Sequence, residues 1–483
     1  MNWRLLVCRR EKVKLHSVGA DRPGRYQSFD LTIRRDVLVS YKQLCLFRLR
    51  NPLTTRSISQ RLKCFRTGKS MTLPISNSRK FPGDISWPVL ILRSVRHGGL
   101  AVTQSLGRLG IPVHVVDANR RTPALFSKYC QGKFIWDIDS APVEDSIAFL
   151  AGISQRFGRR AILVPTTDTA AIFVAANAVA LREWFLFPNV SLDLVQSLHN
   201  KKKMHYLARS IGIPTPNVYF PDTKQDVLNF AQSTSYPVIM KIIRAQLPTN
   251  GAPHGKAIVR GKQELLDHYK LMQDSRGPNL VLQEYISGGD EATWMFNGYF
   301  DSNSDCLFGL TGRKIRQNRP YAGITSLGVC LPNPIVSEMT CKFMKAIGYQ
   351  GILDIGYRFD ARDGLYKVFD VNPRIGCTFR LFVTDTGMDV VRTLYCDLTG
   401  QPFDAGNALP GRKWIVEDLD LASAVRYWRD GKLSILQWAR SFRGLRESTF
   451  FAPDDSRAIL AMCMNGLGEV LRRLGRKATA VAA

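Results

Sequence analysis

The sequence predicts an α/β protein: a parallel α/β domain, then an α+β region, then a helical C-terminal segment. Three observations predict this class. Short apolar runs alternate with helical stretches over residues 86–195, two strands flank a tight turn at Asp363–Gly364, and helical patterns follow residue 406. At 483 residues the chain is too long for one core. We expect a basic arm at 1–85 and domains at 86–195, 196–405 and 406–483.

The arm carries about half of the net charge of +27, because residues 1–70 hold 17 Lys/Arg and 4 Asp/Glu. It has no clear periodicity, so we interpret it as disordered, as an Arg-rich targeting segment, or as an extension upstream of a start at Met71. Aromatic residues do not interleave with its charges as stacking on bases requires, so we expect no nucleic-acid partner.

The apolar runs and the cysteines indicate the cellular location of the protein. No run of about 20 apolar residues exists to span a membrane. The ten cysteines are scattered without a C-x-x-C pair, which argues against zinc and against a secreted disulfide scaffold. We therefore predict a cytoplasmic location.

The first domain opens with a strand, Val89–Arg93, a glycine loop, a helix and a second strand, Val113–Asp117. A further strand, Ala161–Pro165, precedes an Ala-rich helix, so we expect a parallel sheet with right-handed crossovers. The loop reads H-G-G-L-A and lacks the third glycine of a dinucleotide fingerprint. A dinucleotide-dependent oxidoreductase is therefore the less favoured alternative.

The second region begins with a helix, Leu198–Ile211, that contains three consecutive lysines, Lys201–Lys203. Three features follow in order: a strand with Lys241 among apolar residues, a Gly-rich loop at Thr249–Lys256, and a strand that runs into Q-E-Y-I. A lysine on an apolar strand is rarely buried without a partner.

The most informative motif is F-D-V-N-P-R, at the end of the second strand of the hairpin. Side chains two apart on a strand share a face, so Asp370, Asn372 and Arg374 point the same way. Mg²⁺ prefers oxygen ligands together with phosphate, and arginine suits the charge of phosphate.

Helical patterns fill Trp414–Gly475, where Trp428 and Trp438 occur among apolar neighbours, a spacing typical of core packing. The last helix ends in basic residues. Peripheral contact with an anionic membrane is the less favoured interpretation of that helix.

The order of these motifs resembles the ATP-grasp superfamily over residues 195–400, and the domain before them resembles the one that precedes the grasp. The chain is most similar to the predicted ATP-dependent carboligases, a group that includes D-aspartate-ligase-like carboxylate–amine ligases. The resemblance implies an ATP-grasp fold of two subdomains and the use of ATP with Mg²⁺, as one ion or two, with Mn²⁺ as a substitute.

The resemblance also implies which residues hold the nucleotide. Lys241 and one of the three consecutive lysines would bind phosphate, and among those three we choose Lys203. The lid over the phosphates contains His254 and Gly255. The adenine hinge is Gln283, Glu284, Tyr285 and Ile286, and the ribose acid is Glu291, with Asp290 as its alternative.

By the same resemblance, the metal ligands are Asp354, Asp370 and Asn372. The family normally has glutamate where Asp370 stands and a further acid at the position of Gly356. Asp354, on the same face, can take over that role, with Asp360 as the weaker candidate.

The resemblance further implies that the catalytic cations are Lys241, Arg374 at the γ-phosphate, and Arg316 at the acceptor substrate. Arg380 is an alternative that orders the hairpin. The implied reaction activates a substrate carboxylate as an acyl phosphate and joins it to an amine. Both substrates are small molecules of unknown identity. Gly356 raises the alternative of a catalytically degraded ATP-binding protein. The oligomeric state stays open, a homodimer included.

Overall fold

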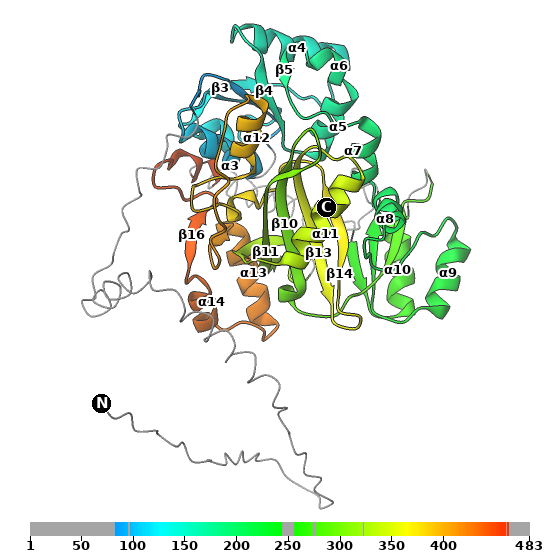
Figure 1. Ribbon diagram of the computed structural model, residues 1–483. Coiled ribbons are helices and arrows are strands. Elements are labelled where there is room, and N and C mark those ends of the chain that lie inside the picture. The colour runs from blue at the N-terminus through cyan, green and yellow to red at the C-terminus, as the bar shows by residue number, and fades with distance from the viewer. Residues whose placement is uncertain are drawn as a thin grey trace, which may run out of the picture. The chain divides into compact units, whose positions relative to one another are not determined.

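The computed structural model describes residues 83–94, 97–243, 256–273, 277–321, 323–459 and 461–462. Within them the strands form three sheets (Figure 1). Residues 1–82 of the predicted arm at 1–85, and the predicted lid residues from Thr249 to Gly255, lie outside the described residues. No described helix has the length and apolar character needed to cross a membrane.

The first sheet is parallel and has the order β3-β2-β1-β4-β5. Its central strand, β1 (Val89–Leu92), is fully buried, as expected for a strand with helices on both faces. The other strands are β2 (Val113–Asp117), β3 (Cys130–Ile135), β4 (Ala161–Pro165) and β5 (Phe185–Leu186). The helices are α3 (Gly98–Gly107), α4 (Val143–Gln155), α5 (Asp168–Ala176), α6 (Ala178–Leu181) and α7 (Leu192–His199). The predicted parallel sheet is thus present.

The second sheet is antiparallel, with the order β6-β9-β7-β8. It comprises β6 (Val218–Tyr219), β7 (Val238–Ile242), β8 (Lys256–Val259) and β9 (Leu280–Glu284), with helices α8 (Lys201–Ser210), α9 (Lys224–Ser233) and α10 (Lys262–Met272). Figure 1 shows α9 and α10 side by side. Asn200 begins α8 by accepting bonds from the amides of Lys202 and Lys203.

The third sheet has the order β14-β13-β10-β11-β12-β15-β16. In sequence order, the sheet begins with β10 (Thr293–Phe300), β11 (Cys306–Asn318), β12 (Ile324–Cys330), β13 (Gly351–Asp360) and β14 (Leu365–Asn372). Helices α11 (Pro334–Ala346) and α12 (Val390–Leu398) accompany it. In the β13–β14 pair, Gly356 lies opposite Asp370 and Asp354 opposite Asn372, with a register shift between Gly356 and Tyr357. Gly364 at the turn has φ +74°, which glycine adopts without strain.

The C-terminal segment is not purely helical, which corrects the prediction. β15 (Lys413–Ile415) and β16 (Leu445–Ser448) extend the third sheet beside α13 (Glu417–Arg429) and α14 (Ile435–Ser441). The consecutive apolar residues Trp414–Val416 are all buried, which suits a strand and not an amphipathic helix. Trp428 is 59% exposed, so its predicted role in core packing was wrong.

Candidate active site

A cavity lies between the second and third sheets, and we call it the intersheet cavity. One sheet contributes Ile239, Lys241, Lys256 and Gln283, and the other contributes Thr293, Lys314, Gln317, Arg358 and Phe369. Pro216, Tyr285, Ile286, Tyr321 and Gly323 complete its lining. Three lysines and an arginine thus face a space with apolar and aromatic walls.

Two of these lysines are cross-strand neighbours, because Lys241 on β7 lies opposite Lys256 on β8. Lys241 Nζ donates to Gln283 Oε1 at 2.8 Å. Burial, with Lys256 and Lys201 nearby, holds the pKa of Lys241 well below its usual value. Burial and the charge of Lys314 lower the pKa of Lys256 to about 8. This wall is therefore electrostatically prepared for an anion.

The third lysine, Lys314 on β11, donates to Gly323 O at 3.0 Å and to Gln317 Oε1 at 3.3 Å. Arg316, predicted to hold the acceptor substrate, instead forms a buried ion pair with Asp420 of α13, with Nε–Oδ1 at 2.8 Å. Irregular register between Lys314 and Arg316 breaks the strict alternation of faces. Lys314, not Arg316, is the cation of this strand that lines the cavity.

Asp370 on β14 forms an ion pair with Lys201, the first residue of α8. Burial alone would raise the pKa of Asp370, but the Lys201 ammonium holds it below its usual range. Lys203 lies elsewhere: its side chain is 54% exposed and its Nζ is 3.6 Å from Asp193. The structure thus brings Lys201, and not the chosen Lys203, to the predicted metal strand.

The three predicted metal ligands lie together. Asn372 Nδ2 donates to Asp370 Oδ2 at 3.1 Å and to Asp354 Oδ2 at 3.4 Å. Burial raises the pKa of Asp354 to about 6, and the charge of Asp370 adds to the increase. Asp360, the weaker candidate, is instead bound by Arg362 and Lys367 at the far end of the hairpin.

A fourth oxygen donor, Asn297 on β10, was missed. Asn297 lies opposite Asp354 in the sheet, is fully buried, and has an Oδ1 without a hydrogen-bond partner. Carboxylate and amide oxygens suit a hard cation such as Mg²⁺. No three Asp, Glu, His or Cys residues of the described chain gather as a metal group, so phosphate oxygens and water would complete the coordination. The donor set fits Mg²⁺ brought in with a nucleotide.

Phe369 occupies the space beside Gly356, where the resemblance implies an acid. The register shifts between Gly356 and Tyr357, and a Cβ added to Gly356 would meet Phe369 Cζ at 2.9 Å. The same ring lies 5.8 Å from Lys241 Nζ. An aromatic wall therefore replaces the expected carboxylate.

Arg374 links the hairpin to the first domain. Its Nε and Nη2 donate to Asp168 at 2.7 and 3.3 Å, and Nη2 also donates to Asn372 Oδ1 at 3.2 Å. Burial alone would raise the pKa of Asp168, but His199 and Arg374 hold it well below its usual range. Arg374 thus joins the predicted metal strand to the start of α5.

The predicted adenine hinge is only partly turned toward the cavity. Gln283, Tyr285 and Ile286 line it. Glu284 faces away, accepting from the amide of Asn217 at 2.9 Å and from Arg362 at 2.9 Å. This follows from strand alternation, because neighbouring residues point to opposite faces.

Of the two ribose acids, Asp290 lies beside the cavity and Glu291 is exposed. Asp290 is buried and accepts from Gln317 Nε2 at 2.7 Å and from Tyr427 Oη. Glu291 accepts a local hydrogen bond from the amide of Gly289 at 3.2 Å. His254 and Gly255 fall outside the described residues.

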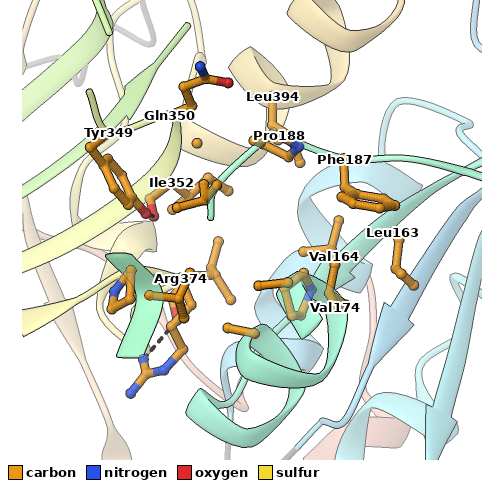
Figure 2. A pocket seen from close by; sticks show the side chains of 18 residues that line it. Leu163, Val164, Val174, Phe187, Pro188, Tyr349, Gln350, Ile352, Arg374 and Leu394 are labelled. Atoms are coloured by element: carbon orange, nitrogen blue, oxygen red, sulfur yellow. Dashed lines mark hydrogen bonds between the residues drawn. The ribbon is translucent and has the colours of Figure 1, made fainter. Parts of the chain in front are cut away.

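A second cavity, drawn in Figure 2, lies between β4, α5 and the segments around Tyr349 and Pro373. Leu163, Val174, Phe187 and Ile352 are among its mostly apolar lining residues. Arg374 is its charged side chain, and it bonds to Ile375 O at 3.0 Å. Such walls do not suit a triphosphate, so we place the candidate site in the intersheet cavity.

The chain is similar to known proteins in sequence and in fold. No family model matches the chain. The D-aspartate ligase of Enterococcus faecium is 22% identical over 286 residues, which cover 57% of this chain and 68% of that one.

Two solved structures share the fold. The L-amino acid ligase from Bacillus licheniformis has a TM-score of 0.51 and 17% identity, covering 68% of this chain and 78% of that one. The biotin carboxylase domain of the Hydrogenobacter thermophilus 2-oxoglutarate carboxylase, solved with MgADP and bicarbonate, has a TM-score of 0.50 and 17% identity, covering 67% and 73%. The predicted fold class and family resemblance are confirmed. The chain shares the fold of these ligase and carboxylase structures and is similar in sequence to D-aspartate ligase.

Proposed function

We propose that the intersheet cavity binds MgATP and that the chain uses it to activate a substrate carboxylate as an acyl phosphate, which an amine then attacks. One observation carries the proposal: Lys241, Lys256 and Lys314 line one cavity next to the Lys201–Asp370 pair. Ammonium groups gathered in a confined space repel one another and favour a polyanionic ligand.

Separate groups of residues bind the phosphates, the metal ion and the adenine. Lys241 and Lys256 neutralise phosphate oxygens from one sheet, and Lys314 does so from the other. Asp354, Asp370 and Asn372 would hold Mg²⁺, which supplies charge neutralisation when bound. Gln283, Tyr285 and Ile286 cover the adenine. Catalysis then rests on positioning and electrostatic stabilisation, without a nucleophilic side chain.

Arg374 donates to the Asp168 carboxylate, to Asn372 Oδ1 and to the carbonyl of Ile375. An arginine held on one side by a carboxylate keeps a fixed orientation while its remaining N–H groups face a ligand. We propose that Arg374 stabilises the charge that develops at the γ-phosphate or acyl phosphate.

The substrates we propose are amino acids or similar small molecules, in keeping with the names D-aspartate ligase and L-amino acid ligase of the two similar proteins. Cys130, Cys330 and Cys396 are buried free thiols, which suits our proposal of a cytoplasmic location.

The test is a screen for ADP release over pairs of carboxylates and amines, with Mg²⁺ or Mn²⁺. The proposal expects release that requires both substrates and is lost in Asp370→Asn. Binding of MgATP without release of ADP for any substrate pair would favour the degraded ATP-binding protein. That alternative is raised by Gly356, which stands where the resemblance implies an acid and has the Phe369 ring beside it. Failure to bind MgATP at all would overturn the proposal.

A further inference from the structure

Helix α13 of the C-terminal segment contacts residues at and beside the intersheet cavity through the side chain of Tyr427. Tyr427 is buried, and its hydroxyl donates to Asp290 Oδ2. The same hydroxyl accepts from the backbone N–H of Tyr321 at 3.3 Å. Tyr321 in turn lines the cavity and donates from its own hydroxyl to Asp430, just after α13, at 3.0 Å.

From Asp290 the contacts continue to a lysine of the cavity. Gln317 Nε2 donates to Asp290 Oδ1 at 2.7 Å, and Lys314 Nζ donates to Gln317 Oε1 at 3.3 Å. Asp290 and Gln317 are both buried. Each group therefore has its orientation set by the next, from Tyr427 through Asp290 and Gln317 to Lys314.

Asp290 affects Lys314 through its charge as well as through the hydrogen bonds that connect the two residues. Burial lowers the pKa of Lys314, while the nearby charges of Asp370, Asp354 and Asp290 oppose that decrease. Without the Tyr427 hydroxyl, one oxygen of the buried Asp290 carboxylate loses its donor. A buried carboxylate that has lost a hydrogen-bond donor is destabilised unless a cation moves closer to it. Lys314 is the first cation in the series of contacts that runs from Tyr427 through Asp290 and Gln317.

We propose that Tyr427 is a positioning residue for nucleotide binding: it holds Asp290 in place, and so keeps the Lys314 ammonium directed at the phosphates. The inference rests on the proposed function and extends the site to a helix outside the grasp region. Tyr427 itself does not line the cavity.

The same extension offers a matched control. Trp438 of α14 donates from Nε1 to Asp420 Oδ2 at 3.0 Å, and Asp420 binds Arg316. This second anchor also joins the C-terminal segment to β11. None of its three residues lines the intersheet cavity.

The experiment measures the Kd of MgATP by calorimetry, with Tm as a check of folding, for the full chain and for Tyr427→Phe, Trp438→Phe, Lys314→Ala and Tyr427→Phe/Lys314→Ala. We expect Tyr427→Phe to weaken binding about tenfold and Trp438→Phe to lower Tm while Kd stays within twofold. In the Lys314→Ala background, Tyr427→Phe should change Kd by less than about twofold, because coupled sites are not additive.

Asp290→Asn keeps the size of the side chain and removes its charge, so it serves as a second variant and should also weaken binding. Equal affinity of Tyr427→Phe and the unaltered chain would overturn the inference. The inference would also be overturned if Tyr427→Phe weakened MgATP binding by the same factor in the unaltered chain and in the Lys314→Ala background. Lack of MgATP binding by the unaltered chain would be a different result, since it would overturn the proposed function itself.

Discussion

Lys241 and Lys256 lie directly opposite each other on adjacent antiparallel strands, so two ammonium groups share one wall of the intersheet cavity. Like charges placed opposite each other in a sheet are destabilising. The pair therefore costs stability in the empty protein, and a polyanion bound between the sheets relieves the repulsion.

Lys241→Met should weaken MgATP binding by about 2–3 kcal/mol, the worth of a charge-assisted hydrogen bond, which is about 100-fold in Kd. Calorimetric titration measures the change. Lys203→Met makes the same substitution on an exposed lysine beside Asp193, and it should leave Kd unaltered. Equal effects of the two variants would show that only net charge matters.

Binding of MgATP should take up protons near pH 8. The pKa of Lys256 is about 8, below the usual 10.5, so this lysine loses its proton as the pH rises through 8 in the empty protein. Phosphate favours the charged form, raises that pKa, and draws a proton from solution. Affinity should therefore fall above pH 8. Titrations in buffers of different ionisation enthalpy measure the uptake, which Lys256→Arg should reduce. Net proton release would contradict the account.

Asp370→Asn should lower ADP release by about 100- to 1,000-fold or more, because the site loses a metal ligand and the partner of Lys201. Steady-state kinetics with a responsive substrate pair would measure it. Asp363→Asn, at the exposed turn of the same hairpin, is the control and should keep most of the activity.

Asp168→Asn should lower both stability and turnover. The substitution removes the charge that binds Arg374, at a cost of about 1–3 kcal/mol in the free energy of unfolding. Urea denaturation measures the first effect, and kcat the second. Unaltered kcat would mean that Asp168 does not orient Arg374 for the reaction.

Gly356→Asp should destabilise the chain without increasing activity. Its Cβ would meet the Phe369 ring at 2.9 Å, and overpacking of this kind costs about 1–3 kcal/mol. Gly356→Asp/Phe369→Ala should fold better than Gly356→Asp alone by urea denaturation. Stable folding of Gly356→Asp by itself would show that the ring moves aside freely.

The hairpin could be predicted from the sequence, because two apolar strands flank the Asp363–Gly364 turn. The register shift between Gly356 and Tyr357 could not be predicted, although Asp354 and Asn372 still lie opposite each other. Lys241 could be found because it interrupts an apolar strand.

The other cations depended on features that the sequence does not display. Successive residues of a helix point in directions about 100° apart, so the phase of α8 decides which of Lys201–Lys203 meets Asp370. The irregularity of β11 near Arg316 depends on pairing with β12, a long-range contact. Asn297 had a visible signal, a lone amide in the apolar stretch T-W-M-F-N-G-Y-F. The role of Tyr427 had none, because α13 reaches Asp290 from 137 residues away.

The central claim is that a magnesium-bound triphosphate lies between the second and third sheets. A crystal structure of the full chain with Mg²⁺ and a non-hydrolysable ATP analogue tests it most directly. The account predicts phosphate density within hydrogen-bond distance of Lys241, Lys256 and Lys314, with the ion at Asp370 and Asn372. Density for the analogue in the apolar cavity lined by Leu163, Val174 and Phe187, or elsewhere on the chain, would contradict it.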